Sequence, residues 1–340
     1  MHQLDLAPVK SLLEQAKPIA ILTHQRPDGD AIGSSLGLYH ILKNLGHQPR
    51  VITPTDYPAN LKWLSDNNKV IIAPNDMEAA LKAVSAARLI FCLDMNALSR
   101  IEPMDAALRF AQVPVVMMDH HLDPEGFHTY AYWDDQAAST AEMVYRFVRD
   151  AGLLESVDSA AAQALYMGIL TDTGSFRFPA VTADTHRIAA DLMDRGAEPA
   201  EAYELIYNND PAKRLGLLGY VLNERMTLIP EKHFAYMTIP LSDMEKFDIQ
   251  NGDTEGFVNF PLSVRGINLS VIMKQDQEKI RMSFRSRGSF PANELAAHFS
   301  GGGHHNAAGG RSAESLDATV EKLLELVDRY AAQLDYDVLG

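Results

Sequence analysis

The sequence predicts an α/β protein made of a mostly parallel sheet with helices on both faces, a helical connector and a smaller mixed-sheet α/β domain. In the first part of the chain, short apolar runs alternate with helical patterns, which is typical of a parallel sheet. Farther along, runs of alternating polarity indicate a second, mixed sheet. The predicted boundaries are 1–195 for the first domain, 196–225 for the connector and 226–340 for the second domain.

Three apolar runs in the first domain are predicted as strands buried on both faces: 18–24, 88–94 and 113–120. Helical patterns lie between them at 31–46 and 77–87. Each strand ends in a residue that can bind a metal, namely His24, Asp94 or His120. Because parallel sheets bind ligands at the carboxyl ends of their strands, we expect these side chains to meet at one edge.

Further carboxylates are predicted to join that edge. Asp28 and Asp30 lie in a loop turned by proline and glycine, and Asp172 comes from a later segment. Four ionised carboxylates would repel one another unless divalent cations supply positive charge. Carboxylate and imidazole ligands without thiolate favour Mn²⁺, with Mg²⁺ or Co²⁺ as alternatives. A pair of such ions about 3.5–4 Å apart serves phosphoryl displacement.

In the second domain, alternating runs predict strands at 233–240, 267–275 and 279–287, with helices at 291–299 and 316–334. Arg285 and Arg287 alternate along the last of these strands, so both guanidinium groups are expected on one face, where they could hold a phosphate. Gly301, Gly302 and Gly303 are predicted to form a loop whose backbone N–H groups bind an anion. The alternative is an ordinary glycine-rich turn beside a solvated basic face.

Composition narrows the class of protein. The 340 residues carry 45 acidic and 30 basic side chains, which argues against a protein that binds long nucleic acid through counterion release. The single cysteine excludes an intramolecular disulfide and favours a reducing compartment. No apolar run approaches membrane-spanning length and no export signal is recognisable, so we expect a cytoplasmic protein without a membrane partner.

Four segments together resemble the motifs of the DHH phosphoesterase superfamily: HQRPDGDAIGS at 24–34, Asp94, DHH at 119–121 and TDTG at 171–174. SFRSRG at 283–288 and GGGHHNAAGG at 301–310 resemble the DHH-associated C-terminal domain, which binds substrate. The resemblance covers nearly the whole chain. Within the superfamily, the layout is most similar to the bifunctional nanoRNases, which degrade very short oligoribonucleotides and dephosphorylate adenosine 3′,5′-bisphosphate (pAp).

The resemblance implies a role for each matching residue. One metal would be held by His24, Asp28 and Asp94, and the other by Asp30, Asp94, His120 and Asp172. Asp94 would therefore bridge the two ions. His121 would contact the scissile phosphate or the leaving oxygen, while Asp119 would orient a neighbouring ligand by a hydrogen bond. In the second domain, His304 would meet the base or the terminal phosphate of the substrate.

Three classes of function follow from these motifs. The first is a nanoRNase with pAp phosphatase activity that acts as a homodimer on substrates of two to about five nucleotides and not on long duplexes. The second is a related hydrolase, either a pyrophosphatase or exopolyphosphatase, or a phosphodiesterase for linear or cyclic dinucleotides. The third is a non-catalytic nucleotide-binding regulator, which would lack a metal ligand, whereas all six ligand positions are filled here.

Overall fold

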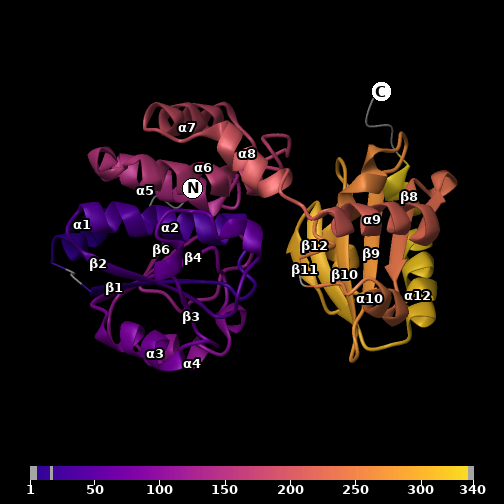
Figure 1. Ribbon diagram of the computed structural model, residues 1–340, viewed down its shortest axis with the longest axis horizontal. Helices are drawn as coiled ribbons and strands as arrows, with labels where there is room; N and C mark the ends of the chain where they lie inside the picture. Colours follow the sequence, from indigo (N-terminus) through magenta and orange to yellow (C-terminus); the bar gives the residue numbers. More distant parts are fainter. Residues whose placement is uncertain (1–5, 16–17, 251, 336–340) are drawn as a thin grey trace. The chain divides into compact units, whose positions relative to one another are not determined.

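The structure, a computed structural model, describes residues 6–15, 18–250 and 252–335. Contacts between residues divide the chain into two units, Met1–Asn209 and Asp210–Gly340. The division falls inside the 196–225 segment expected to be a connector. Each unit contains its own six-stranded sheet, so the predicted combination of a parallel-sheet domain and a mixed-sheet domain is confirmed (Figure 1).

The sheet of the first unit has the strand order β3-β2-β1-β4-β5-β6, and every neighbouring pair is parallel. Its strands are β1 (Pro18–Thr23), β2 (Gln48–Thr53), β3 (Ile71–Ile72), β4 (Leu89–Leu93), β5 (Val115–Asp119) and β6 (Tyr130–Trp133). The chain leaves β1 toward β2 and β3 and then returns to β4 on the other side of β1. In parallel sheets, ligands bind at the carboxyl ends of the strands where such a change of direction occurs, here β1 and β4.

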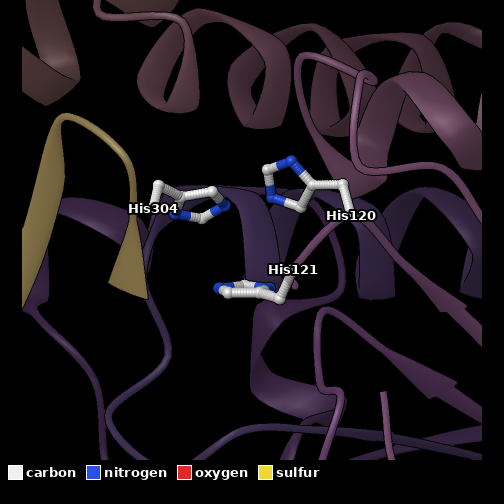
Figure 2. Close-up of side chains that lie close together, drawn as sticks. All are labelled: His120, His121 and His304. Carbon is white, nitrogen blue, oxygen red and sulfur yellow. The ribbon is translucent and has the colours of Figure 1, made fainter. Parts of the chain in front are cut away.

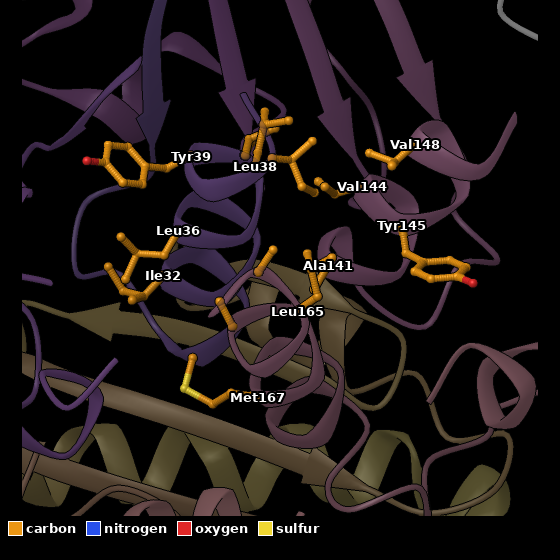
Figure 3. Close-up of a cluster of buried hydrophobic side chains, with 14 of the residues drawn as sticks. Ile32, Leu36, Leu38, Tyr39, Ala141, Val144, Tyr145, Val148, Leu165 and Met167 are labelled. Carbon is orange, nitrogen blue, oxygen red and sulfur yellow. The ribbon is translucent and has the colours of Figure 1, made fainter. Parts of the chain in front are cut away.

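Helices cover both faces of this sheet (Figure 1). The helices are α1 (Leu6–Gln15), α2 (Gly29–Asn44), α3 (Met77–Ala86), α4 (Asp105–Arg109), α5 (Thr140–Asp150), α6 (Ser159–Asp172), α7 (Ala183–Asp194) and α8 (Pro199–Tyr207). Helices α1, α2, α5 and α6 contribute to one buried cluster, and α3 and α4 contribute to the cluster on the opposite face. Figure 3 shows part of the first cluster, where Ile32 and Leu36 of α2 lie near Ala141 of α5 and Leu165 of α6.

Helices α2 and α6 pack with their backbones in close approach, and glycine makes this possible. A Cβ atom at Gly33 would lie 2.6 Å from the carbonyl oxygen of Ala164 and 2.7 Å from the amide nitrogen of Gly168. Neither backbone atom can move away without shifting the helix, so only a residue without a side chain fits. The contact holds the start of α2, which carries Asp30, beside the end of α6, which carries Asp172.

The second unit has the strand order β11-β12-β10-β9-β8-β7, in which β8 and β9 are parallel and the other pairs antiparallel. Its strands are β7 (Met226–Ile229), β8 (Phe234–Ile239), β9 (Leu269–Gln275), β10 (Ile280–Ser286), β11 (Gly302–His304) and β12 (Ala307–Ser312). Its helices are α9 (Ala212–Tyr220), α10 (Leu241–Lys246), α11 (Ala292–Ala297), α12 (Leu316–Arg329) and α13 (Ala331–Leu334). Residues of α11 and α12 pack on one face of the sheet, and residues of α9 pack on the other.

Two predictions about the second unit were wrong in detail. The expected glycine-rich loop is a strand pair, because Gly302, Gly303 and His304 form β11 and pair with β12. Glycine is needed there for packing, since a Cβ at Gly301 would lie 2.0 Å from the carbonyl oxygen of Gly309. The single helix expected at 316–334 is divided at Tyr330.

Of the helices in the described ranges, none has the length and apolar character needed to cross a bilayer.

Candidate active site

His24 directly follows β1 and turns its ring toward a carboxylate. Nδ1 lies 2.9 Å from the backbone oxygen of Gln25 and donates to it, so Nε2 is the nitrogen left to act as a ligand. Nε2 lies 3.2 Å from Asp94 Oδ2 and 3.9 Å from Asp28 Oδ1. Asp28 also caps α2, because Oδ1 accepts hydrogen bonds from the amides of Asp30 and Ala31. His24, Asp28 and Asp94 therefore offer ligand atoms that all lie within 4.8 Å of one another.

Asp94 follows β4 in a left-handed backbone conformation, with φ of 58°. This conformation costs a non-glycine residue about 1–3 kcal/mol, and such strain concentrates at functional sites. Its two carboxylate oxygens face different partners. Oδ2 faces His24, whereas Oδ1 lies 3.2 Å from the Thr140 hydroxyl and 3.7 Å from His120 Nε2. Asp94 thus lies between the two imidazoles, as a bridging ligand would.

A second group of ligand atoms forms around His120, which directly follows β5. Nδ1 donates to the backbone oxygen of Ala137 at 3.1 Å, so Nε2 again faces the carboxylates. Nε2 lies 3.3 Å from Asp172 Oδ2 and 3.9 Å from Asp30 Oδ2. Asp30, His120 and Asp172 offer ligand atoms within 4.8 Å of one another. In both groups, a backbone carbonyl orients an imidazole toward carboxylates, which is the usual arrangement around a metal-binding histidine.

The sequence analysis missed the residues that hold Asp30 in place. The amide of Thr140 donates to Asp30 Oδ2 at 2.6 Å, and the amide of Ala141 donates to Asp30 Oδ1 at 2.8 Å. Both amides belong to the first turn of α5, which Ser139 caps by accepting a hydrogen bond from Glu142 N. The start of a helix binds anions through its unpaired N–H groups. Ser139 and Glu142 have the spacing of a helix-start signal, but nothing in the sequence at 139–142 identifies Asp30 as the bound anion.

Charge crowding shifts the pKa values of the buried ligands in opposite directions. Burial raises the pKa of Asp30 well above its usual value, and the charges of Asp94 and Asp172 add to the effect. Burial alone would also raise the pKa of Asp94, but the hydrogen bond with His24 and the charges of the nearby imidazoles hold it well below its usual value.

Both imidazoles have raised pKa values. Burial lowers the pKa of His24, but the hydrogen bond and charge of Asp94 outweigh it, and for His120 the charges of Asp172 and Asp94 do the same. These shifts reflect buried carboxylates crowded together around two imidazoles. Divalent cations would neutralise the carboxylates, so this donor set fits a pair of hard cations.

His121 lies beside the cluster but uses its Nδ1 differently. Nδ1 donates to Asp119 Oδ1 at 2.8 Å, and Asp119 is fully buried. The Trp133 indole N–H donates to the His121 carbonyl oxygen at 2.7 Å, which fixes the backbone as well. Figure 2 shows the rings of His120 and His121, whose centroids are 5.1 Å apart at an interplanar angle of 73°. Asp119 was predicted to orient a neighbouring metal ligand by a hydrogen bond, but the residue it orients is His121, which is not one of the predicted ligands.

In the second unit, Arg285 and His304 lie in one row across the sheet. Arg285 of β10 pairs with Ala307 of β12, and Ala307 pairs in turn with His304 of β11. Side chains of directly paired residues project from the same face. Arg287 lies just beyond β10, where its amide donates to the Asn268 carbonyl oxygen. The structure thus places the arginine of the strand and the histidine of the edge strand on one face, about 10 Å apart along the row.

Comparisons with known proteins agree with this arrangement. The model of the DHH family, N-terminal domain, matches residues 18–169, and the model of the DHHA1 domain matches residues 231–333. A Thermus thermophilus protein named bifunctional oligoribonuclease and PAP phosphatase NrnA is 32% identical over 325 residues, covering 94% of this chain and 92% of that protein. The Bacillus subtilis protein of the same name is 26% identical, covering 86% of this chain and 88% of that protein.

A solved structure matches over the full length. The crystal structure of an exopolyphosphatase-related protein from Bacteroides fragilis has a TM-score of 0.94 and 34% sequence identity, and it covers 99% of this chain and 100% of that chain. The matches in both units are consistent with the two sheets.

Proposed function

Since this chain belongs to the DHH family of phosphoesterases, we propose that it is a two-metal enzyme that hydrolyses short oligoribonucleotides and pAp. The observation that carries the proposal is the pair of ligand groups around Asp94. The substrate class is supported by the Thermus thermophilus and Bacillus subtilis relatives, which are named bifunctional oligoribonuclease and PAP phosphatase and match this chain over most of its length.

In this proposal each ligand group holds one divalent cation. His24, Asp28 and Asp94 bind one ion, and the other is bound by Asp30, Asp94, His120 and Asp172. The chemistry of the ligands favours Mn²⁺, with Mg²⁺ and Co²⁺ as alternatives. Two such ions lower the pKa of water to supply a nucleophile at neutral pH and stabilise negative charge on the phosphate.

The protein's own side chains orient the reacting groups. His24 and His120 are fixed by backbone carbonyls, so their Nε2 atoms enter the site in one orientation. His121 is fixed by Asp119, which leaves Nε2 as the atom it directs at the scissile phosphate or the leaving oxygen. In the cationic form of the ring, which the Asp119 carboxylate would stabilise, Nε2–H would protonate that oxygen as the P–O bond breaks, and the ring would be left neutral.

The second unit supplies contacts to the rest of the substrate in this proposal. Arg285 and Arg287 would bind a non-scissile phosphate through their guanidinium groups. His304 would meet the base or a terminal phosphate, while the amides of Gly302 and Gly303 are further candidates for phosphate contacts. The amide of Gly301, the first glycine of the motif, instead donates to the Ala296 carbonyl oxygen at 3.1 Å. We also propose a homodimer, which would give a mass of twice the 37.6 kDa chain in light scattering.

A phosphoanhydride hydrolase is the second candidate function. It is favoured by the full-length structural match to a protein titled exopolyphosphatase-related. Pyrophosphate and polyphosphate carry no base. Only the first candidate therefore requires residues that bind a nucleobase.

The test is a panel of substrates incubated with purified protein and Mn²⁺: pAp, ribonucleotides of two to ten residues, cyclic dinucleotides, pyrophosphate and polyphosphate. The proposal predicts the highest kcat/KM for pAp and for chains of two to about five nucleotides. Higher kcat/KM for pyrophosphate or polyphosphate than for any nucleotide would contradict it and select the second candidate.

A further inference from the structure

The segment that follows α6 makes an unusual turn next to a predicted metal ligand. Asp172 ends α6, and Gly174, Ser175 and Phe176 have φ values of 56°, 64° and 63°. Ser175 and Phe176 are non-glycine residues in the left-handed region, which is unfavourable and persists only where surrounding contacts enforce it. Here the Phe176 ring is held by stacking on His186 at 5.2 Å and by Tyr166 at 6.1 Å.

The turn brings Arg177 and Phe178 to the surface. Both side chains are exposed, and Phe178 has 36% of its surface accessible. The Arg177 guanidinium lies over the Phe178 ring, 5.4 Å from its centroid. The tip of the ring also covers Gly174, because a Cβ there would lie 2.6 Å from Phe178 Cζ. The Phe178 ring is therefore held over Gly174, two residues after Asp172 in the sequence.

Helix α8 adds two tyrosines to the same surface. Ala202 and Ile206 form its buried side, whereas Tyr203 and Tyr207 are 44% and 38% exposed. Their rings are 4.9 Å apart. The Tyr207 hydroxyl interacts with the Ser175 side chain and lies within electrostatic range of Arg177 and Asp172. Arg177, Phe178, Tyr203 and Tyr207, which we call the aromatic surface, therefore lie beside the Asp172 end of the site.

Core packing does not account for this arrangement. Single exposed apolar side chains are common on proteins, but an exposed phenylalanine under an arginine, with a pair of exposed tyrosines on the neighbouring helix, indicates a binding surface. Within the described ranges, the Arg177 guanidinium makes no ion pair within 4.0 Å. Aromatic rings and a guanidinium plane present flat faces and a positive charge, the combination that binds the bases and backbone of a single-stranded nucleotide.

We propose that the aromatic surface stacks a nucleobase of the substrate, namely a base of the nucleotide whose phosphate is bound at the Asp172 end of the metal site. The inference rests on the proposed function and extends it. Because every base has a flat face, stacking would favour nucleotides over inorganic phosphoanhydrides without selecting a sequence.

The test compares Phe178→Leu, Tyr203→Leu and the double variant with wild-type protein. Leucine keeps apolar cover over Gly174 but removes the aromatic face. Phe110→Leu is the matched control, because Phe110 is a 74% exposed phenylalanine of the same unit at the end of α4. The substrates are dinucleotides that carry 2-aminopurine at either position, together with versions from which one base has been removed.

Loss of one base–aromatic stack corresponds to a roughly 5- to 150-fold weaker affinity. We expect Phe178→Leu to raise the Kd and KM of the dinucleotide within that range and to reduce the quenching of 2-aminopurine fluorescence at one position only. Removal of that base should weaken binding to wild type and abolish the difference between wild type and Phe178→Leu. Phe178→Trp, which keeps an aromatic face at this position, should bind the dinucleotide about as tightly as wild type. Phe110→Leu should also behave as wild type.

Three results would overturn the inference. One is unchanged dinucleotide affinity in the double variant. Another is an equal loss for base-containing and base-free substrates, which would assign Phe178 to the support of the turn. The third is a reduced stabilisation by Mn²⁺ in Phe178→Leu, since stacking does not involve the metal ligands. If wild type failed to hydrolyse dinucleotides, the proposed function would fall, while the fluorescence measurement would still decide whether a base stacks here.

Discussion

His120 and His121 are adjacent in the sequence, yet their hydrogen bonds give them different environments. His120 donates Nδ1–H to a backbone carbonyl and turns Nε2 into the carboxylates, whereas His121 donates Nδ1–H to Asp119. We expect His120→Ala to lose bound metal. We expect His121→Ala to keep both metals and to lower kcat about 10²–10⁴-fold, the range for a lost acid catalyst. Elemental analysis combined with steady-state kinetics measures both effects, and equal metal loss in the two variants would refute the assignment.

Substitution of Asp119 tests the catalytic role of His121 without removing the imidazole. If its carboxylate acts by orienting His121, Asp119→Asn should lower kcat by about 10–100-fold while leaving metal content unchanged. A variant with normal kcat would show that the hydrogen bond has no catalytic role.

At the residue scale, the sequence predicted which side chains come together in the two groups of candidate ligands. It did not predict the backbone amides that hold those side chains in place. His24, Asp94 and His120 could be predicted to converge because parallel strands end at one edge. The two amides that hold Asp30 could not, because they belong to α5, and pairing between residues 110 positions apart in sequence follows only from tertiary packing.

At the element scale, the close contact of α2 and α6 determines the separation of Asp30 and Asp172. Gly33→Ala would place a methyl group against backbone atoms, and overpacking of this kind costs about 1–3 kcal/mol. It should also weaken Mn²⁺ binding, because the two ligands move apart. Gly216→Ala in α9 is the control, since a Cβ there meets no atom within 4 Å and helix propensity favours alanine. Thermal denaturation with and without Mn²⁺ measures both effects; equal stability of the two variants would contradict this account.

A hydrogen-bonded carboxylate links α7 to α5. Asp191 accepts hydrogen bonds from the Tyr145 hydroxyl at 2.7 Å and from Arg195 at 2.6 Å. Burial raises the pKa of Asp191, but the hydrogen bonds from Arg195 and Tyr145 outweigh it and hold the pKa below its usual value. Because the folded-state pKa is depressed, the stabilisation is complete above the unfolded-state pKa and is lost as the pH falls through the folded-state pKa.

We therefore expect Asp191→Asn to lower the free energy of unfolding by about 1 kcal/mol at pH 7, since the carboxylate is partly exposed. The difference from wild type should shrink as the pH falls below about 4. Urea denaturation at several pH values measures it. A difference that grew at low pH would mean that the stabilising group is not the ionised carboxylate.

Strongly patterned elements were predictable, while short or polar ones were not. The buried apolar runs correctly predicted β1, β4 and β5, and the alternating runs predicted β8, β9 and β10. The segment Gln48–Thr53 was not recognised as a strand because it starts with polar residues and is buried only toward its end. The glycine-rich hairpin of β11 and β12 was misread, because a run without side chains has no pattern of polarity.

At the scale of the whole molecule, chemistry and substrate recognition are assigned to different units. The proposed metal ligands all belong to Met1–Asn209, and the row of Arg285 and His304 belongs to Asp210–Gly340. We expect Arg285→Ala to lower kcat/KM for pAp and dinucleotides by about 1.5–3 kcal/mol, the range for a hydrogen bond to a charged group, with metal content unchanged. Normal cleavage of both substrates by this variant would exclude the row from substrate binding.

Selectivity for short chains follows from the same division of roles and from the overall charge. The formal net charge is −15, so a long strand gains little from contacts beyond the two sites. The kcat/KM on a dinucleotide should exceed that on a twenty-nucleotide strand at the same ionic strength. Comparable values would move the assignment toward a general phosphodiesterase.

The central claim is that two divalent cations share Asp94, and Asp94→Asn tests it most directly. The measurement is the rate of pAp and dinucleotide hydrolysis at saturating Mn²⁺, with Asp194→Asn, an exposed aspartate of α7, as the control. A shared ligand should contribute at least as much as one oxyanion-hole donor, so we predict a loss of about 10²–10³-fold or more in a protein that remains folded. An Asp94→Asn variant that kept more than about a tenth of the wild-type rate would contradict the claim, because its loss would fall well short of that contribution.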